Sequence, residues 1–243
     1  VGVLAFSGYK LYGIFFGYKE ADDTYAKIDE ILIKDVPEEG PKFVWNYQEL
    51  LKINPDLKGY LLMQGDDQII NGVHYPVVQC DNKSYYLNHL FDGTENRAGC
   101  LFIDCGIKDG MNAMNCVIYG HNMNNEAMFG CLSDYDNEEF FKAHPAFDVY
   151  VGEKHYLYKV FAAFQVGLDD QVYVYGFSSD EDFMNYVQKI LDEKNSRMTY
   201  DTGFTIDDFS PDSKIITMST CLDQYQEEYR YVVLMVRDCE IMD

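Results

Sequence analysis

Short runs of valine, isoleucine, tyrosine and phenylalanine, separated by turn residues, make up most of the chain after Pro55 and limit the folds open to it. Such runs are typical of β-strands, and residues 155–166 alternate with a period of two. Because helical patterns occur only occasionally between the runs, they favour a closed or nearly closed, largely antiparallel barrel over a parallel sheet. The expected strands are residues 59–63, 73–79, 100–105, 116–119, 147–151, 155–166, 214–221 and 230–237.

Apolar residues also recur at helical spacing in a few places. Residues 20–34 predict a surface helix ahead of the barrel, and residues 45–52 predict a second, short one. The clearest pattern lies at residues 180–194, where apolar side chains recur at i, i+3, i+4, i+7 and i+8 behind a capping Ser179. Residues 126–143 predict a weaker helix. The fold class is therefore mainly β with helices, including a long helix before the last two strands.

The chain has 243 residues, of which 47% are hydrophobic, so it can bury one full core. We expect three segments: an apolar piece at residues 1–17, a helical segment at residues 18–56, and the barrel domain at residues 57–243. The 41 Asp and Glu residues outnumber the 19 Lys and Arg residues and give a net charge of −22. This charge repels phosphate backbones and weakly attracts amines, which argues against nucleic acid as a partner.

Residues 1–16 are apolar and aromatic apart from Lys10, but they are too short and too interrupted to span a bilayer by themselves. An apolar start followed by a charged helix suits membrane-tethered architectures. We therefore expect residues 1–17 to be either the remnant of an N-terminal membrane anchor or an ordinary apolar helix.

The seven cysteines are odd in number and lack Cys-x-x-Cys spacing, which argues against a zinc site, a redox site or a disulfide framework. Cys221 differs from most of the others because it ends an apolar strand, immediately before a polar loop. A strand end can present a nucleophile to substrate, although most free thiols are simply buried. A nucleophilic thiol also needs a partner, because its ordinary pKa of about 8.5 leaves little thiolate at neutral pH.

Two other residues could act together with Cys221. His121 follows the strand at residues 116–119, so it leaves the sheet at a strand end as Cys221 does. Arg230 begins the last strand, and a hairpin would return its permanently charged guanidinium beside the thiol, where it could bind a carbonyl oxygen. Each residue also has a simpler interpretation, as a surface histidine or as an arginine paired with a nearby acid.

Three segments together resemble the signature of the sortase family. They are a TLxTC-like strand at residues 217–221, a histidine loop at residues 119–123 and an arginine strand at residues 230–233, in that order. Met218 replaces the usual leucine, a swap that conserves volume. The resemblance runs from about Trp45 to the C-terminus. Similarity to class B comes from residues 53–60, 75–79, 86–88 and 128–130 and from the helix at residues 180–194.

The resemblance implies a sortase-type mixed barrel of about eight strands and a cysteine transpeptidase. Such an enzyme cleaves a C-terminal sorting signal of the NPxTx kind in secreted proteins, through a thioester on Cys221, and passes the acyl group to an amine. His121 would transfer protons and Arg230 would hold the reacting carbonyl. Asp223 would be a possible orienting carboxylate. Residues expected to bind the signal are Ser219, Thr220, Leu87 and Tyr173.

The resemblance also implies partners and a location. The acceptor amine would come from a peptidoglycan cross-bridge or from a pilin lysine. The protein would lie at the extracellular face of the plasma membrane of a Gram-positive bacterium, held by a single N-terminal anchor. No cofactor is expected. Class A members of the family use calcium, but the acidic pair Asp207–Asp208 lacks the spaced oxygen ligands of a calcium loop, so no metal is expected here.

Two alternatives use the same residues differently. A hydrolytic cysteine protease would form the same thioester and would resolve it with water instead of an amine. An adhesive or scaffold module with an inactive site would not depend on Cys221 at all. The presence of all three catalytic residue types argues against the second alternative.

Overall fold

The computed structural model describes residues 2–33, 44–65, 72–221 and 228–242. Its helices are α1 (Gly2–Ile33), α2 (Tyr47–Ile53), α3 (Glu138–Ala143) and α4 (Asp180–Arg197). Its strands are β1 (Leu57–Met63), β2 (His74–Val78), β3 (Leu101–Ile103), β4 (Asn115–Tyr119), β5 (Ala146–Val151), β6 (Lys154–Gly167), β7 (Ile215–Cys221) and β8 (Tyr229–Ile241).

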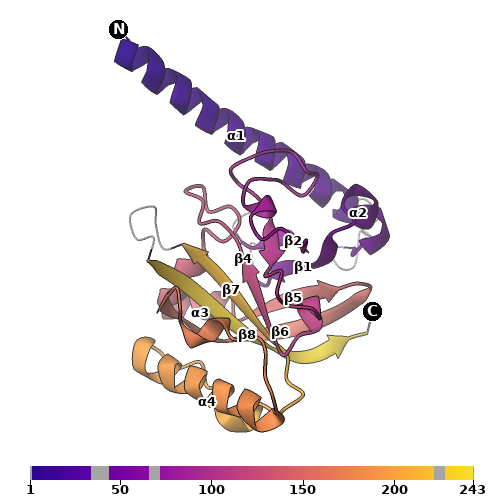
Figure 1. Ribbon diagram of the computed structural model, residues 1–243, viewed down its shortest axis with the longest axis vertical. Helices are drawn as coiled ribbons and strands as arrows, with labels where there is room; N and C mark the ends of the chain where they lie inside the picture. Colours follow the sequence, from indigo (N-terminus) through magenta and orange to yellow (C-terminus); the bar gives the residue numbers. More distant parts are fainter. Residues whose placement is uncertain (1, 34–43, 66–71, 222–227, 243) are drawn as a thin grey trace.

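The strands close into one mixed barrel in the order β1-β2-β3-β4-β7-β8-β6-β5 (Figure 1). The pairs β2–β3 and β4–β7 are parallel, and the other neighbours are antiparallel. Pairing of β1 with β5 closes the barrel. The described residues thus confirm the predicted barrel and its strands, whose ends shift by up to a few residues.

Helix α4 forms where the sequence predicts it and covers an outer face of the barrel (Figure 1). It begins after Ser179, whose hydroxyl accepts a hydrogen bond from the Asp182 backbone N–H at 3.1 Å. Its apolar face packs on β6 and β8 in a second hydrophobic cluster, where Phe183, Val187 and Ile190 are fully buried. Burying a side chain of this size contributes roughly 1.5–3 kcal/mol, so α4 is firmly attached.

Helix α1 is longer than the predicted helix at residues 20–34, since it begins at Gly2 and continues without interruption to Ile33. Its second half packs on the barrel, with Tyr25 and Leu32 buried, while its first half projects away (Figure 1). The Tyr25 hydroxyl donates a hydrogen bond to the Gly99 carbonyl at 2.8 Å. The Tyr25 ring meets the Tyr75 ring edge-on at a centroid distance of 5.0 Å. These contacts fix α1 against β2 and the segment before β3.

In the part of the chain that the structure describes, no helix combines the length and the apolar composition that crossing a membrane requires. The expectation of a single N-terminal anchor at the extracellular face of a membrane is corrected to this extent: no described helix, α1 included, is suited to be that anchor. The physical reason lies in the composition of α1, where Lys10, Lys19 and interspersed glycine and tyrosine interrupt the apolar residues.

The predicted helix at residues 126–143 is mostly wrong. Only α3 and a short 3₁₀ turn at Leu132–Asp136 form in this stretch. Glu126 and Met128 have φ angles of 64° and 58°, in the left-handed region that a right-handed helix excludes. The first part of the segment is therefore a loop, which follows directly after His121.

Asn115, at the start of β4, is fully buried and uses its whole amide group. Its Nδ2 donates to the carbonyls of Val172 at 3.0 Å and Val174 at 2.8 Å, and lies 2.9 Å from the Tyr186 hydroxyl. Its Oδ1 accepts a hydrogen bond from Thr217 Oγ1 at 2.8 Å. One side chain therefore joins β4, β7, α4 and the short turn that precedes α4.

Replacing this amide is expected to destabilise the fold. Asn115→Ala leaves buried carbonyls and hydroxyls without partners, and we expect a loss of roughly 2–4 kcal/mol in the free energy of unfolding, measured by urea denaturation. Asn185→Ala, at an exposed position on α4, is the matched control and should change it by less than about 0.5 kcal/mol. Equal effects of the two substitutions would contradict the role given to Asn115.

Candidate active site

The parallel pairing of β4 with β7 brings two predicted catalytic residues to the same end of the barrel. Tyr119 lies opposite Ser219, and the Gly120 backbone N–H donates to the Ser219 carbonyl at 3.2 Å. His121 and Cys221 each follow two residues after these partners. Because parallel strands run in the same direction, both residues leave their paired positions at the same edge of the sheet.

The antiparallel hairpin of β7 and β8 adds the third residue. Cys221 lies directly opposite Arg230, in the last pair of the β7–β8 register. Residues facing each other in antiparallel strands have Cα atoms about 4.5–5.5 Å apart. The backbones of His121, Cys221 and Arg230, far apart in the sequence, therefore converge at one end of the barrel.

The imidazole of His121 is half-buried and is held by a backbone carbonyl. Its Nε2 lies 2.8 Å from the carbonyl oxygen of Leu87. A carbonyl can only accept, so Nε2 carries the hydrogen and Nδ1 is the lone-pair nitrogen of the neutral ring. On the other side, the Phe129 backbone N–H donates to the His121 carbonyl at 3.0 Å. The orientation of the histidine is thus fixed from two directions.

The Leu87 carbonyl, which accepts the hydrogen bond from His121, lies in a turn that packs closely against the backbone of Gly99. Gly99 has a φ of 63°, in the left-handed region that favours glycine. A Cβ at this position would lie 2.5 Å from the Tyr86 carbonyl oxygen and 3.0 Å from that of Leu87. The Cys100 backbone N–H, next along the chain, donates to the Tyr86 carbonyl at 3.0 Å. The segment carrying Leu87 is therefore locked onto the start of β3.

The predicted substrate-binding residues lie around this same end. Leu87 is half-buried in a 3₁₀ turn at Tyr85–Leu87. The Tyr173 hydroxyl is 3.0 Å from Ser219 Oγ, and its ring stacks on that of Tyr119. Ser219 and Thr220 are only 1% and 2% exposed. Thr220 Oγ1 is buried and has no hydrogen-bond partner among the described residues.

Asp223, the predicted orienting carboxylate, lies outside the described residues. A carboxylate that the sequence reasoning missed is Asp104, whose Oδ2 is 3.4 Å from the Tyr119 hydroxyl. Burial, followed by the charge of Asp104, raises the pKa of Tyr119. The available signal was an acid placed directly after an apolar strand, the same kind of position that identified Cys221.

No group of three His, Cys, Asp or Glu side chains within the described ranges is arranged to hold a metal ion. The expectation of a metal-free enzyme stays a prediction.

Three of the six other cysteines are buried and unreactive. Burial raises the pKa of the Cys100 and Cys131 thiols to about 12 and raises that of the Cys116 thiol as well. Such thiols stay protonated near neutral pH and are poor nucleophiles. Cys105 and Cys239 are exposed, and Cys80 is half-buried.

Comparison with known proteins gives consistent matches. The family model described as the sortase domain matches residues 69–237. Sortase B of Listeria monocytogenes is 28% identical over 223 residues, which cover 91% of this chain and 86% of that protein. Sortase B of Staphylococcus aureus is 28% identical over 245 residues, which cover 98% of this chain and 92% of that protein. The structure of sortase B from B. anthracis in complex with AAEK1 superposes with a TM-score of 0.74 at 27% identity. The superposition covers 92% of this chain and 99% of that one.

The chain belongs to the sortase family, since the family model spans most of it and the barrel is of the same kind. Within that family its class is B. It is accordingly a cysteine transpeptidase that acts on sorting signals.

The buried thiols should resist modification in the native protein. At pH 8, iodoacetamide should leave Cys100, Cys116 and Cys131 unmodified, because the raised pKa of each keeps it protonated and burial blocks access. Peptide mass spectrometry of the native and urea-unfolded protein measures this. All seven cysteines should react after unfolding; native-state labelling of these three would contradict the packing described here.

Gly120, directly before His121, leaves no room for a side chain. An added Cβ would lie 2.5 Å from Leu101 Cδ2 and 2.7 Å from Phe129 Cδ2, and both of these side chains are fully buried. Gly120→Ala should therefore cost about 1–3 kcal/mol in stability and displace the histidine loop. We expect a lower melting temperature and slower peptide cleavage.

Gly176→Ala is the control for that substitution, because nothing lies within 4 Å of a Cβ at that position. It should change neither the melting temperature nor the rate of peptide cleavage. If both alanine variants behave like the unmodified protein, Gly120 does not position the histidine.

Proposed function

We propose that Cys221 is the nucleophile, His121 the proton-transfer group and Arg230 the group that stabilises the oxyanion. The observation that carries this proposal is the register of β4, β7 and β8, which brings the three backbones to one end of the barrel. We further propose residues 57–243 as the catalytic domain.

In the first step, the Cys221 thiolate attacks the carbonyl carbon of the threonine in an NPxTx-like signal. The carbonyl oxygen becomes negative and is stabilised by the Arg230 guanidinium, which is permanently charged. Protonated His121 gives its proton to the departing amine as the peptide bond breaks. The products of this step are a thioester on Cys221 and a released C-terminal tail.

In the second step, a neutral amine attacks the thioester carbon. His121, now neutral, accepts the proton of the attacking amine while the sulfur leaves as a thiolate. The Leu87 carbonyl fixes one ring nitrogen, so the other is the atom that exchanges the proton. The acceptor in this proposal is an amine of the peptidoglycan cross-bridge, or a lysine if the enzyme polymerises pilin.

The groove for the signal is proposed to lie between Leu87 and Tyr173. Both are half-buried and lie next to predicted catalytic positions, Leu87 through His121 and Tyr173 through Ser219. Ser219 would then contribute by holding Tyr173, and Thr220 by the buried hydroxyl that lacks a described partner. Asp223 retains its proposed role in orienting His121 or Arg230.

A thioester-trapping experiment tests these roles. The protein is incubated with a panel of sorting peptides, and the adduct on Cys221 is followed by mass spectrometry. Cys221→Ala should give no adduct, and His121→Ala and Arg230→Ala should each slow its formation by roughly 100-fold or more. Arg97→Ala, at an exposed position, should have no effect.

The second half of the same experiment adds a labelled amine. Product carrying the amine supports transfer, whereas free acid alone supports hydrolysis by a protease. Unchanged adduct rates in the His121 and Arg230 variants would overturn the roles proposed for them. Full activity in Cys221→Ala would overturn the nucleophile assignment.

A further inference from the structure

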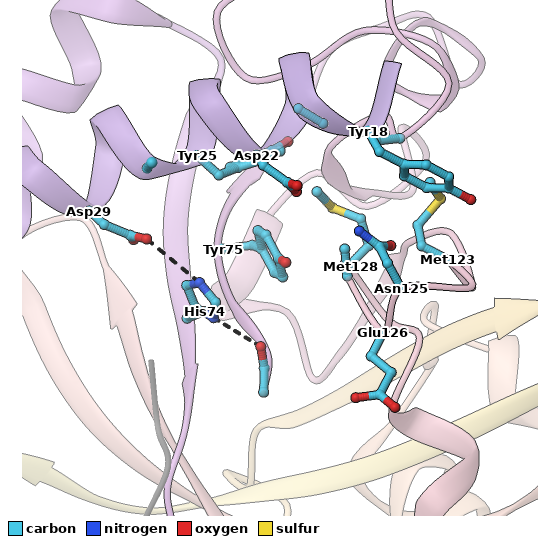
Figure 2. A pocket seen from close by; sticks show the side chains of 15 residues that line it. Tyr18, Asp22, Tyr25, Asp29, His74, Tyr75, Met123, Asn125, Glu126 and Met128 are labelled. Atoms are coloured by element: carbon cyan, nitrogen blue, oxygen red, sulfur yellow. Dashed lines mark hydrogen bonds and ion pairs between the residues drawn. The ribbon is translucent and has the colours of Figure 1, made fainter. Parts of the chain in front are cut away.

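A pocket of about 400 Å³ lies between α1 and the barrel (Figure 2). One wall is a face of α1 that includes Asp22, and a second is formed by β2. The third wall is the loop at residues 123–128, which follows His121. The volume is within the range of pockets that bind small organic ligands.

Among the described residues that line it, the pocket has several acids and no lysine or arginine. Its described lining includes the carboxylates of Asp22, Asp29 and Glu126. Asp29 faces His74, with Asp29 Oδ2 3.7 Å from His74 Nε2. Asp22 has no ion-pair or hydrogen-bond partner among the described residues, and Figure 2 shows its carboxylate directed towards Asn125. Its negative charge is therefore available to a ligand.

Partial desolvation adds to this preference for a positively charged ligand, with Asp29 half-buried and Asp22 still exposed to solvent. Burial, together with the charge of Asp23, raises the pKa of Asp22. Burial also raises the pKa of Asp29. A partly desolvated carboxylate is stabilised by a cation placed against it, and a ligand can supply that cation.

The rest of the lining suits an aliphatic chain that carries an amino group. The rings of Tyr18, Tyr25 and Tyr75 offer faces and edges that attract a cation and pack against methylene groups. Met123 and Met128 supply flexible apolar surface on the opposite wall (Figure 2). A charged floor and apolar sides match an alkylammonium group better than a hydrated metal ion.

The pocket and the proposed active site share one loop. Met123 is two residues after His121, so their Cα atoms are at most roughly 7 Å apart. Met128 pairs with Asn122 in an isolated bridge, and the next residue, Phe129, donates to the His121 carbonyl. A ligand in the pocket therefore lies against the loop that carries the proposed proton-transfer group.

We propose that this pocket is a subsite for the amine acceptor and holds a protonated amino group of that acceptor against Asp22. The inference rests on the proposed function. The attacking amine must be neutral, so the group held here is a second amino group, which does not react. The acceptor class is consequently a molecule with two amino groups, such as a peptide with a free N-terminus and a lysine-type side chain.

Paired acceptors test the subsite. Unbranched diamines of increasing chain length are each compared with the monoamine of the same carbon number, and the acceptor KM is measured for transfer from the Cys221 thioester. The best diamine should have a KM about 3-fold lower than its monoamine, as expected for one solvent-exposed ion pair. Asp22→Asn should remove this advantage while leaving the monoamine KM unchanged.

Asp23→Asn is the matched control, since it removes the same charge at the adjacent position, which is exposed as Asp22 is but does not line the pocket. It should keep the advantage of the diamine. Equal KM values for diamine and monoamine, or equal effects of the two substitutions, would overturn the subsite.

Two further measurements separate the possible failures. Thioester yield is recorded for each variant, so a failure of the proposed function shows as a missing adduct and not as a changed acceptor KM. In unsubstituted protein carrying ¹³C-methyl methionine, the diamine should shift the Met123 and Met128 methyl signals and the monoamine should not. Shifts at neither methyl would overturn the proposal even if Asp22→Asn fails to fold.

Discussion

The site depends on the parallel pairing of β4 with β7. Parallel strands need a long connection, and here Asn115 and Thr217 are 102 positions apart in the chain although their side chains share a hydrogen bond. The buried amide of Asn115 helps to fix the register, because a slip of one residue would exchange the two faces of the strand. With the register fixed, the residues that follow each strand meet without further adjustment, and the antiparallel β8 brings in the arginine.

Much of the barrel could be predicted from the sequence because its strands are short apolar runs with clear turn residues between them. Helix α4 was equally clear, since its cap and its apolar spacing agree. Two helical assignments failed for identifiable reasons. Residues 126–143 have helical spacing, but Glu126 and Met128 take left-handed angles that periodicity does not reveal. Helix α1 joins the apolar helix that was one of two expectations for residues 1–17 to the helix predicted at residues 20–34, and the sequence did not show that the two are continuous, because the first half lacks the amphipathic pattern of a helix packed on a core.

The candidate site was predictable in part. Cys221, His121 and Arg230 were predicted from strand ends and from family resemblance, and the register explains why the backbones of such positions meet. The support around them could not be predicted. The bond from His121 to the Leu87 carbonyl depends on a loop whose path no spacing encodes. Asn115 gave a weak signal, as an asparagine beside an apolar run, where this residue is unfavourable in a strand. The pocket beneath α1 needs three separate segments and has no sequence signature.

Gly99 links two parts of the molecule that otherwise look independent. Its carbonyl receives the Tyr25 hydroxyl from α1, and its missing side chain allows the carbonyl of Leu87, the acceptor for His121, to approach. Helix α1 and the His121 imidazole are therefore both supported by the backbone around Gly99, the first by a direct hydrogen bond and the second through Leu87. A chimaera that replaces this helix must therefore keep a tyrosine that reaches the Gly99 carbonyl, or the backbone that supports the histidine loses one of its contacts.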